Sequence, residues 1–546
     1  MSDAALHRAR SSSFRGALVL LLALPACGDV PAEDARRPST GGTAVVGGQA
    51  DLAALNPLSA NENTTEQILR HGLFVALVGQ DAEGDYVPAL AESWSAQGDS
   101  AVVFRLRRDL RWHDGVPTTA RDVAFTFARV KDPATGFPYA GRFQRWTSAE
   151  ALDSFTVRAT LEPHIDALTA WATTPLAPAH LLDSVPPERT AMAAFGRRPV
   201  GNGPFRFVEW RAGDRLVLEA NPDFPEGLGG RPRLDRVVYR VLPDLTSQLA
   251  ELATGQLDLV LNVPVGEVPR LAERGHIIEG PRQQFAFIGW NGRRGVLSDA
   301  RVRRALTLAV DRQAMVELLR GGYGGPAVGP VPPTHWAFAS DLRPLPFDTA
   351  AAGALLEQAS VLDRDGDGRR EGPDGVPLRI ELKFPSQDPV FRSASQLVAS
   401  DLARVGVTVV PTPVEGSTLI GQVTSAERPF DAILLTWNVE DMAALRGLFH
   451  SEALDGPLQL AGYQSARADS LLDVVAAASS RERAAPAWRE LQAVLSEEQP
   501  WSFLYYFSIL AARSARLQGV EMDVRGQLAS MPGWWIGEPD AATAGR

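Results

Sequence analysis

Apolar and polar residues alternate in some stretches of this chain and recur at helical spacing in others. Strand patterns and helix patterns follow one another along the chain without an internal repeat, which indicates a mixed α/β architecture. The patterns predict strands at 45–50 and 102–107, a strand-rich region that includes 216–224 and 237–241, a helix over 66–78, and a helix followed by a turn over 249–258.

Residues 112–123 are expected to form a tight turn that leads into a capped helix. Thr119 precedes Asp122 by three residues, the spacing of a capping box, in which a hydroxyl and a carboxylate accept the free amide protons of the first helical turn. Farther along, Gly201 and Gly203 permit backbone angles that other residues avoid, and Pro204 stiffens the exit from this segment.

The first residues of the chain have the order of a secretory signal. Arginines at positions 8, 10 and 15 precede the apolar run 17–24, and the small-residue segment Pro25-Ala26-Cys27 follows. Charged, apolar and small-residue regions in this order are typical of a signal peptide. The apolar run is shorter than the about 20 residues that span a bilayer, so we expect it to be removed.

Leu24-Pro25-Ala26-Cys27 resembles the bacterial lipobox, in which the cysteine thiol receives a diacylglycerol and becomes the new amino terminus. The resemblance predicts a lipoprotein signal peptide over 1–27 and lipidation of Cys27; the alternative is a plain signal peptide with a stray cysteine. Residues 28–43 are rich in Gly, Pro and charge and are expected to be a flexible tether. Residues 538–546 are expected to fray.

Composition excludes several classes of function. The net charge of the 546-residue chain is −11, which argues against nucleic acid as a partner because phosphates attract basic patches. Lys131 and Lys383 are the only lysines and neither belongs to a phosphate-binding loop, so nucleotide hydrolysis by that route is excluded. With one cysteine the chain forms no internal disulfide, and its stability must come from core burial.

The sequence offers no catalytic constellation. Its eight histidines show no paired metal-ligand spacing, there is no Gly-x-Ser-x-Gly elbow, and Gly201-x-Gly203 lacks the third glycine of a dinucleotide fingerprint. His113 is expected to be a hydrogen-bonding turn residue. We therefore expect neither enzymatic activity nor a cofactor.

An ordered set of motifs resembles the family 5 extracellular solute-binding proteins, the peptide, nickel and oligosaccharide receptors of ABC importers. The resemblance covers nearly all of residues 44–510. The motifs are Pro-Ala-Leu-Ala-Glu-Ser-Trp at 88–94, Trp-His-Asp-Gly with Thr-Ala-Arg-Asp-Val at 112–123, Val-Gly-Asn-Gly-Pro at 200–204, Phe-Ile-Gly-Trp-Asn at 287–291, the segment 299–312, Gly-Pro-Val-Pro-Pro at 329–333 and Phe-Asp-Ala-Ile at 430–433.

The resemblance implies an α/β, two-lobed periplasmic-binding-protein fold (type II, cluster C-like) with an extra inserted subdomain, whose lobes close around a ligand. Three groups of segments are expected. They are a discontinuous lobe I (44–60, 199–275 and 511–537), an inserted subdomain of lobe I (61–198), and lobe II (276–510).

The resemblance also implies where the ligand binds. In peptide-binding relatives an aspartate three positions after a tryptophan anchors the ligand's ammonium group; here Trp437 is followed at that spacing by Glu440, with Asp441 beside it. A carboxylate facing a desolvated cation is a sensible anchor, because a charged pair gains strength in a low dielectric. The alternatives are a solvated loop that caps a helix at 442–449 and, for Trp437, a place in the core.

Further ligand contacts are expected from Asn61, Glu62 and Asn63, which follow the first strand as a segment lining the cleft does in relatives; an ordinary surface turn is the alternative. Asn291 closes the Phe-Ile-Gly-Trp-Asn strand at the position where relatives cross between lobes. It is a candidate for the ligand site or for the hinge.

Residues 363–374 have the spacing of a calcium-binding loop. Asp363, Asp365, Asp367 and Asp374 occupy positions one, three, five and twelve, with glycine at six, although the last position lacks the usual glutamate. Relatives carry a similar stretch that looks like a turn before a strand, and a strand pattern follows here too at 378–384. We expect no metal in this protein and keep calcium at this loop as the alternative.

The leading hypothesis is an exported, lipid-anchored receptor of the cell envelope or periplasm that captures an extracytoplasmic solute, with a short peptide as the expected ligand, and delivers it to ABC permease subunits. Its partners would be that solute, the permease and membrane lipid through Cys27. The alternatives are a sensory receptor of the same fold and an importer receptor for a sugar, an opine or a metal chelate, because the fold alone does not choose the ligand.

Overall fold

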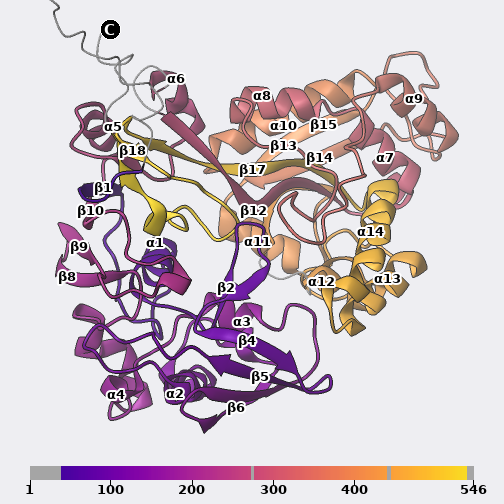
Figure 1. The fold of residues 1–546 in the computed structure, drawn as a ribbon. Helices are drawn as coiled ribbons and strands as arrows, with labels where there is room; N and C mark the ends of the chain where they lie inside the picture. The colour runs from indigo at the N-terminus through magenta and orange to yellow at the C-terminus, as the bar shows by residue number, and fades with distance from the viewer. Residues whose placement is uncertain (1–37, 272–275, 440–443, 538–546) are drawn as a thin grey trace, which may run out of the picture. The chain divides into compact units, whose positions relative to one another are not determined.

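The computed structural model describes residues 38–271, 276–439 and 444–537 (Figure 1). The predicted signal peptide at 1–27 with its Cys27, most of the predicted tether at 28–43, and the segment 538–546 lie outside the described residues. Glu440 and Asp441 lie outside them as well.

A long mixed sheet runs through the described residues in the order β15-β14-β16-β12-β17-β11-β1-β10-β9-β8, and β13 pairs with β17 beside this path. Its strands are β1 Thr43–Gly48, β8 Phe205–Arg211, β9 Arg215–Ala220, β10 Arg236–Val241, β11 Leu259–Val260, β12 His276–Trp290, β13 Gly325–Pro326, β14 Arg379–Pro385, β15 Thr408–Val414, β16 Ala432–Asn438 and β17 Trp501–Arg513. β1 is parallel to β10 and β11, and β14 is parallel to β15 and β16. Each half of the sheet therefore contains adjacent parallel strands, an arrangement that α/β proteins cover on both faces.

The long strands β12 and β17 pass from one half of the sheet into the other and pair with each other along the way (Figure 1). The antiparallel register runs from His276 opposite Arg513 to Gly289 opposite Trp501. It shifts between Pro281 and Phe285, where the proline has no amide proton for the ladder. A second register shift lies between Ala286 and Phe287, and such irregularities bend a strand locally.

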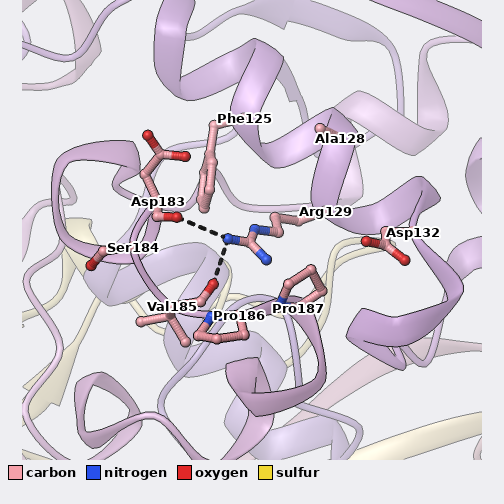
Figure 2. Close-up of a pocket in the computed structure, with 9 residues that line it drawn as sticks. All are labelled: Phe125, Ala128, Arg129, Asp132, Asp183, Ser184, Val185, Pro186 and Pro187. Carbon is pink, nitrogen blue, oxygen red and sulfur yellow. Dashed lines mark hydrogen bonds between the residues drawn. The ribbon is translucent and has the colours of Figure 1, made fainter.

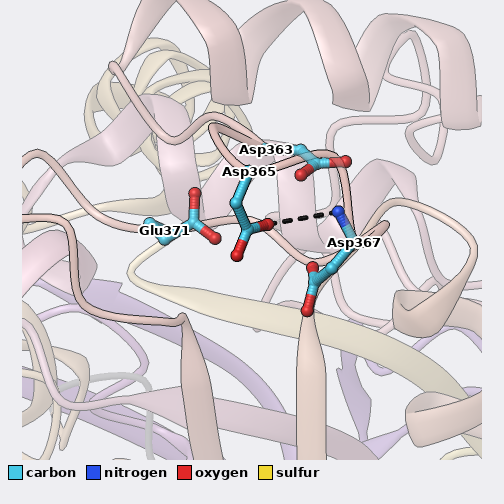
Figure 3. A group of neighbouring side chains, drawn as sticks. All are labelled: Asp363, Asp365, Asp367 and Glu371. Carbon is cyan, nitrogen blue, oxygen red and sulfur yellow. Dashed lines mark hydrogen bonds between the residues drawn. The ribbon is translucent and has the colours of Figure 1, made fainter.

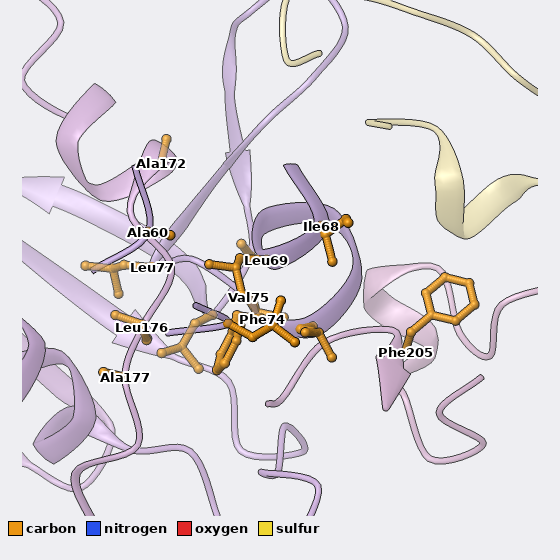
Figure 4. Packing of buried hydrophobic residues seen from close by; sticks show 14 of the residues in the cluster. Ala60, Ile68, Leu69, Phe74, Val75, Leu77, Ala172, Leu176, Ala177 and Phe205 are labelled. Atoms are coloured by element: carbon orange, nitrogen blue, oxygen red, sulfur yellow. The ribbon is translucent and has the colours of Figure 1, made fainter. Parts of the chain in front are cut away.

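The apolar core divides between the same halves. One cluster of buried side chains draws on residues 44–261 and 511–534, and Figure 4 shows a part of it around Leu69, Phe74 and Phe205. Separate clusters draw on residues 285–506. A smaller cluster packs Leu252 and Leu271 against Leu510 of β17. The division agrees with a chain of two lobes, while the predicted boundaries between the segments stay predictions.

A smaller antiparallel sheet lies within 61–198, in the order β4-β5-β7-β6, and helix α2 packs against its β6 strand. Its elements are β4 Ala91–Ala96, β5 Ala101–Leu106, β6 Trp146–Asp153, β7 Thr156–Leu161 and α2 Ala120–Lys131. Short pairs complete the strands: β2 Val78–Gln80 with β3 Tyr86–Pro88, and β18 Leu517–Gln518 with β19 Trp535–Ile536.

The remaining helices lie beside the long sheet or, for α3 and α4, in the part of the chain that holds the smaller sheet (Figure 1). They are α1 Asn63–Ile68 with the π-helical turn η2 Leu69–Leu73, α3 Thr169–Thr173, α4 Ala179–Leu182, α5 Leu245–Ala253, α6 Val268–Leu271, α7 Ala300–Leu308, α8 Arg312–Arg320, α9 Thr349–Gln358, α10 Pro389–Ala403, α11 Gly416–Thr424, α12 Ala444–Phe449, α13 Ala466–Ala477 and α14 Arg481–Glu498. Across the described ranges, no helix is both long enough and apolar enough to cross a bilayer.

Most local predictions are confirmed. The predicted strands correspond to β1, β5, β9 and β10, and the capping box of α2 is formed, with the Thr119 amide donating to Asp122 at 2.8 Å. The helix predicted over 66–78 is wrong at its end. It begins at Asn63, widens to a π-helical turn and stops at Leu73, because Phe74 is already extended and its amide donates back to Leu69.

The apolar pattern beyond Leu73 had suggested more helix. Phe74, Val75 and Leu77 are buried, but they lie outside any helix. The helix predicted within 249–258 starts earlier, at Leu245, because the Asp244 side chain accepts the amide proton of Ser247 and caps it there.

Candidate ligand-binding site

Trp437, a predicted ligand residue, lies near the end of β16, which pairs with β12. Trp437 stands opposite Phe285 in this ladder and is half-buried. Its ring packs against the core of this half, with its centroid 6.1 Å from that of Trp501. The contact fixes the ring and leaves part of it accessible, so both predicted roles, core and ligand contact, stay open.

A stack of buried aromatic rings supports Trp437 from below. Phe287 and Trp501 lie face to face with centroids 3.9 Å apart, and Phe449 meets Trp501 edge-on at 4.9 Å. Aromatic pairs add about 0.5–1.5 kcal/mol each beyond the apolar area that they bury. The end of β16 is therefore held on a rigid base formed by β12, β17 and α12.

The ladder between β12 and β16 continues to the residue before the predicted anchor. The amide of Val439 donates to the carbonyl oxygen of Gln283 at 2.8 Å, and Val439 is buried. Glu440 and Asp441 lie outside the described residues, so their role as the ammonium anchor stays a prediction.

Asn291 is buried at the end of β12, and its side-chain amide forms hydrogen bonds with backbone groups. Its Nδ2 donates to the carbonyl oxygens of Arg428 and Phe430 at 3.2 and 2.8 Å, and its Oδ1 accepts the Arg293 amide proton at 3.2 Å. With 1% of its surface exposed, the side chain fastens the chain before β16 to the end of β12. These contacts favour the structural alternative over ligand contact.

The segment Asn61-Glu62-Asn63 forms the start of helix α1. Both carboxylate oxygens of Glu62 accept amide protons, from Thr64 at 2.8 Å and Thr65 at 2.7 Å, so Glu62 is the N-cap. The Asn63 side chain accepts from Gln67. Asn61 and Asn63 are both exposed.

Two of the sequence motifs meet in one buried junction. The His113 amide donates to the Gly201 carbonyl at 2.7 Å, and its ring Nε2 donates to the Gly203 carbonyl at 3.1 Å. A Cβ on Gly201 would lie 1.9 Å from the Leu73 carbonyl oxygen, which explains the glycine. Burial lowers the pKa of His113 to about 4, so the ring is neutral at pH 7, as a turn residue rather than an acid or base would be.

The arginine-rich motif at 299–312 is also structural. Arg303 donates to the carbonyl oxygens of Leu297, Ser298, Glu498 and Gln499, and burial lowers its pKa. Arg312 donates to the carbonyls of Ala327 and Phe503 at 3.2 and 3.1 Å, and burial lowers its pKa to about 10. These buried cations hold irregular backbone in place.

The predicted calcium loop gathers three of its four expected ligands. Asp363, Asp365 and Asp367 lie with Glu371 in a group whose nearest carboxylate oxygens are within 4.8 Å of one another (Figure 3). Asp374 is outside this group, and its carboxylate accepts the Val376 amide proton. Asp363, Asp365 and Asp367 also accept amide protons within the loop, as the turn alternative expects. Calcium binding stays a prediction here.

A pocket of about 360 Å³ lies between α2 and the segment after α4 (Figure 2). Arg129 lines this pocket and donates to the carbonyls of Leu182, Asp183 and Val185 at 3.2, 3.3 and 2.6 Å. Its guanidinium thus ties α2 to this segment. None of the predicted ligand residues lines this pocket.

One group of polar residues was missed by the sequence analysis. Arg481, at the start of α14, donates to Asp166 at 2.6 Å across 315 positions of sequence, and Trp336 donates to the same carboxylate at 3.0 Å. No motif includes these residues. In the sequence, an arginine that follows a helix-capping serine does not indicate that its side chain pairs with a distant residue.

Comparison with known proteins gives matches along nearly the whole chain. Residues 85–452 match the family model of bacterial extracellular solute-binding proteins, family 5. The oligopeptide-binding protein AppA of Bacillus subtilis is 28% identical over 95% of this chain and 97% of its own length. Heme-binding protein A of Haemophilus influenzae is 28% identical over 80% of this chain and 81% of its own.

Comparison with solved structures also gives matches along nearly the whole chain. The structure of Bacillus subtilis AppA in complex with a nonapeptide has a TM-score of 0.65 at 27% identity and covers 92% of this chain and 100% of that one. The unliganded open form of the periplasmic murein tripeptide-binding protein MppA has a TM-score of 0.80 at 20% identity over 92% of this chain and 98% of that one. The predicted fold class is confirmed.

Asn291→Ala is expected to destabilise the protein by about 1–3 kcal/mol, because it leaves buried carbonyl groups without a donor, and to leave ligand affinity within about twofold. Urea unfolding measures the first quantity and ligand titration of the folded variant measures the second. Wild-type stability combined with lost binding would show instead that Asn291 contacts the ligand.

Proposed function

Since the chain belongs to the bacterial extracellular solute-binding proteins, family 5, and is therefore a transport receptor and not an enzyme, we propose that it captures a short peptide and hands it to an ABC permease. The observation that supports the peptide is the alignment with oligopeptide-binding protein AppA over 95% of the chain. That relative's structure holds a nonapeptide.

The proposed binding site lies between the lobes, beside the end of β16. Trp437 would pack on the ligand, and Glu440, with Asp441 beside it, would hold the ligand's ammonium group. Such a pair needs water to be excluded to gain strength, which the closing of the lobes would achieve. Asn61 would approach from the other lobe, and the remaining predicted contacts, Glu62, Asn63 and Asn291, would act through the backbone that they hold.

Binding would shift the protein from an open to a closed state by differential affinity for the closed one. The closing motion is proposed to bend β12 and β17 near Pro281 and Phe285, where their register shifts. Delivery to the permease needs no chemistry from the receptor.

We also propose that the protein is exported and anchored in the cell envelope through a lipid on Cys27. The charged, apolar and small-residue order of 1–27 supports export, and the lipobox-like Leu24-Pro25-Ala26-Cys27 supports lipidation. A tether over 28–43 would keep the binding lobes near the permease.

A second candidate ligand is haem, because heme-binding protein A also aligns with most of this chain. The proposed acidic anchor would distinguish a peptide from haem by the charge of the group that each ligand presents to it. A peptide offers a free ammonium group to Glu440, whereas haem offers carboxylates, which an acidic anchor repels.

Short peptides are expected to raise the melting temperature of the mature protein, since a ligand at about 100 times its Kd stabilises the folded state by roughly 2.7 kcal/mol. Differential scanning fluorimetry with pools of tri- to nonapeptides measures the shift, with haem, oligosaccharides, opines and nickel–histidine as matched panels. A shift from one of those panels and none from peptides would refute the peptide assignment.

Glu440→Gln is expected to weaken a peptide with a free amino terminus by about 10-fold or more, because a hydrogen bond to a charged group contributes roughly 1.5–3 kcal/mol. The same peptide with an acetylated amine should bind both proteins equally. Calorimetric titration measures both, and Asp441→Asn serves as the neighbouring control. Equal losses for the free and the blocked peptide would reject Glu440 as the anchor.

Cys27→Ser is expected to move the protein from the membrane fraction to the soluble fraction of cell extracts, because the thiol that accepts the lipid is gone. Immunoblots of the separated fractions measure the distribution. Retention of the variant in the membrane fraction would overturn the proposed anchor.

A further inference from the structure

Arg481 makes the most extensive polar contact between the predicted inserted subdomain, residues 61–198, and the predicted lobe II. Arg481 begins helix α14, and its Nε donates to Asp166 Oδ1 at 2.6 Å. Its Nη1 donates to Asp85 Oδ1 at 2.9 Å and to the Gly84 carbonyl at 3.3 Å. A single guanidinium thus joins two separate loops, one between β2 and β3 and one between β7 and α3.

Aromatic rings from both sides enclose this guanidinium. Its carbon lies 4.8 Å from the ring centroid of Tyr86, in the inserted subdomain, and 5.3 Å from that of Trp336, in lobe II. Cation–π contacts of this kind contribute more when water is excluded, and arginine is suited to them because its planar group stacks and donates at the same time.

Both carboxylate oxygens of Asp166 accept hydrogen bonds from side chains of lobe II. Its Oδ1 accepts from Arg481, and its Oδ2 accepts from Trp336 Nε1 at 3.0 Å. The backbone φ of Asp166 is 59°, in the left-handed region that few side chains other than Asn and Asp adopt readily. The neighbouring Ile165 packs against the apolar core of lobe II. The loop that holds Ile165 and Asp166 therefore contacts lobe II through both apolar and charged side chains.

The ion pair is partly shielded from water. The side chains of Arg481 and Asp166 are 20% and 22% exposed, whereas that of Asp85 is 69% exposed. Burial acts to lower the pKa of Arg481, but the charge and hydrogen bond of Asp166, together with Tyr86 and Asp85, outweigh it, and the pKa is raised. Burial lowers the pKa of nearby His335 to about 4, so that ring adds no charge at pH 7. Asp166 is therefore the main partner and Asp85 a minor one.

We propose that Arg481 with Asp166, Asp85, Tyr86 and Trp336 is a closure latch, which forms when lobe II meets the inserted subdomain and breaks when the lobes open. The proposal rests on the proposed function, because a latch has a purpose in a receptor that opens and closes. It gives the inserted subdomain a role, which is to hold the closed state and so to set how slowly ligand leaves.

The lone cysteine of the chain permits a direct test without ligand. In a Cys27→Ser background, Leu152→Cys on β6 and Val474→Cys on α13 place spin labels at side chains that are 56% and 50% exposed. Double electron–electron resonance then measures the distances between inserted subdomain and lobe II in the peptide-free protein. We compare the latch-intact protein with Arg481→Ala and with Asp166→Asn, which tolerates the same backbone angle.

Arg483→Ala is the matched control, because Arg483 also lies in the first turn of α14, is exposed, and donates to Ser479 at 3.0 Å. Ser480 caps the helix in every variant, so folding is expected to be preserved. The latch predicts that Arg481→Ala and Asp166→Asn move the distances to longer values, while Arg483→Ala leaves them unchanged. Unchanged distances in Arg481→Ala, or equal changes in Arg483→Ala, would overturn the latch.

A second readout uses a peptide that the wild type binds. Stopped-flow kinetics should show ligand dissociation about 10-fold faster in Arg481→Ala, with the association rate within about twofold, since the latch forms after the ligand has entered. Equal dissociation rates would contradict the latch. If the wild type binds no peptide, the proposed function fails, yet the spin-label distances still decide whether the latch exists.

Discussion

The antiparallel pairing of β12 with β17 is the constraint on which the rest of the structure depends. These strands lie in the middle of the long sheet and bring together parallel strands that are far apart in sequence, β1, β10 and β11 in one half and β14, β15 and β16 in the other. Register shifts between Pro281 and Phe285 and between Ala286 and Phe287 interrupt this ladder, and the proposed closing motion would bend the strands there, because bulges bend a strand locally.

The parts on either side of this bend differ in what holds them. Near the end of β16, the half-buried ring of Trp437 packs on Trp501, which stacks on Phe287. Helix α1 is capped by Glu62 and fastened to the 523–531 segment through Gln67, which accepts the Leu528 amide proton at 2.9 Å. Both predicted contact segments are thus attached to well-packed elements, and a preorganised site loses less conformational entropy when it binds a ligand.

The sequence predicted features that short-range chemistry decides. The Thr119–Asp122 cap and the strands β1, β5, β9 and β10 follow from neighbouring residues, and ordered motifs identified the family. The end of the helix after Leu73 was missed, since the apolar pattern is the same in a helix and in buried extended chain. The roles of Asn291, with partners at 428 and 430, and of Arg481, with a partner 315 residues away, depend on tertiary contacts that no local pattern encodes.

The central claim is that this chain is a receptor whose closed lobes hold a peptide. Native mass spectrometry of protein freshly isolated from its own cells, before and after mild unfolding, tests it most directly. For a peptide receptor, we expect added masses that fragment into amino-acid sequences and disappear on unfolding. A single added mass of haem, a sugar or a metal chelate, present at full occupancy, would contradict it.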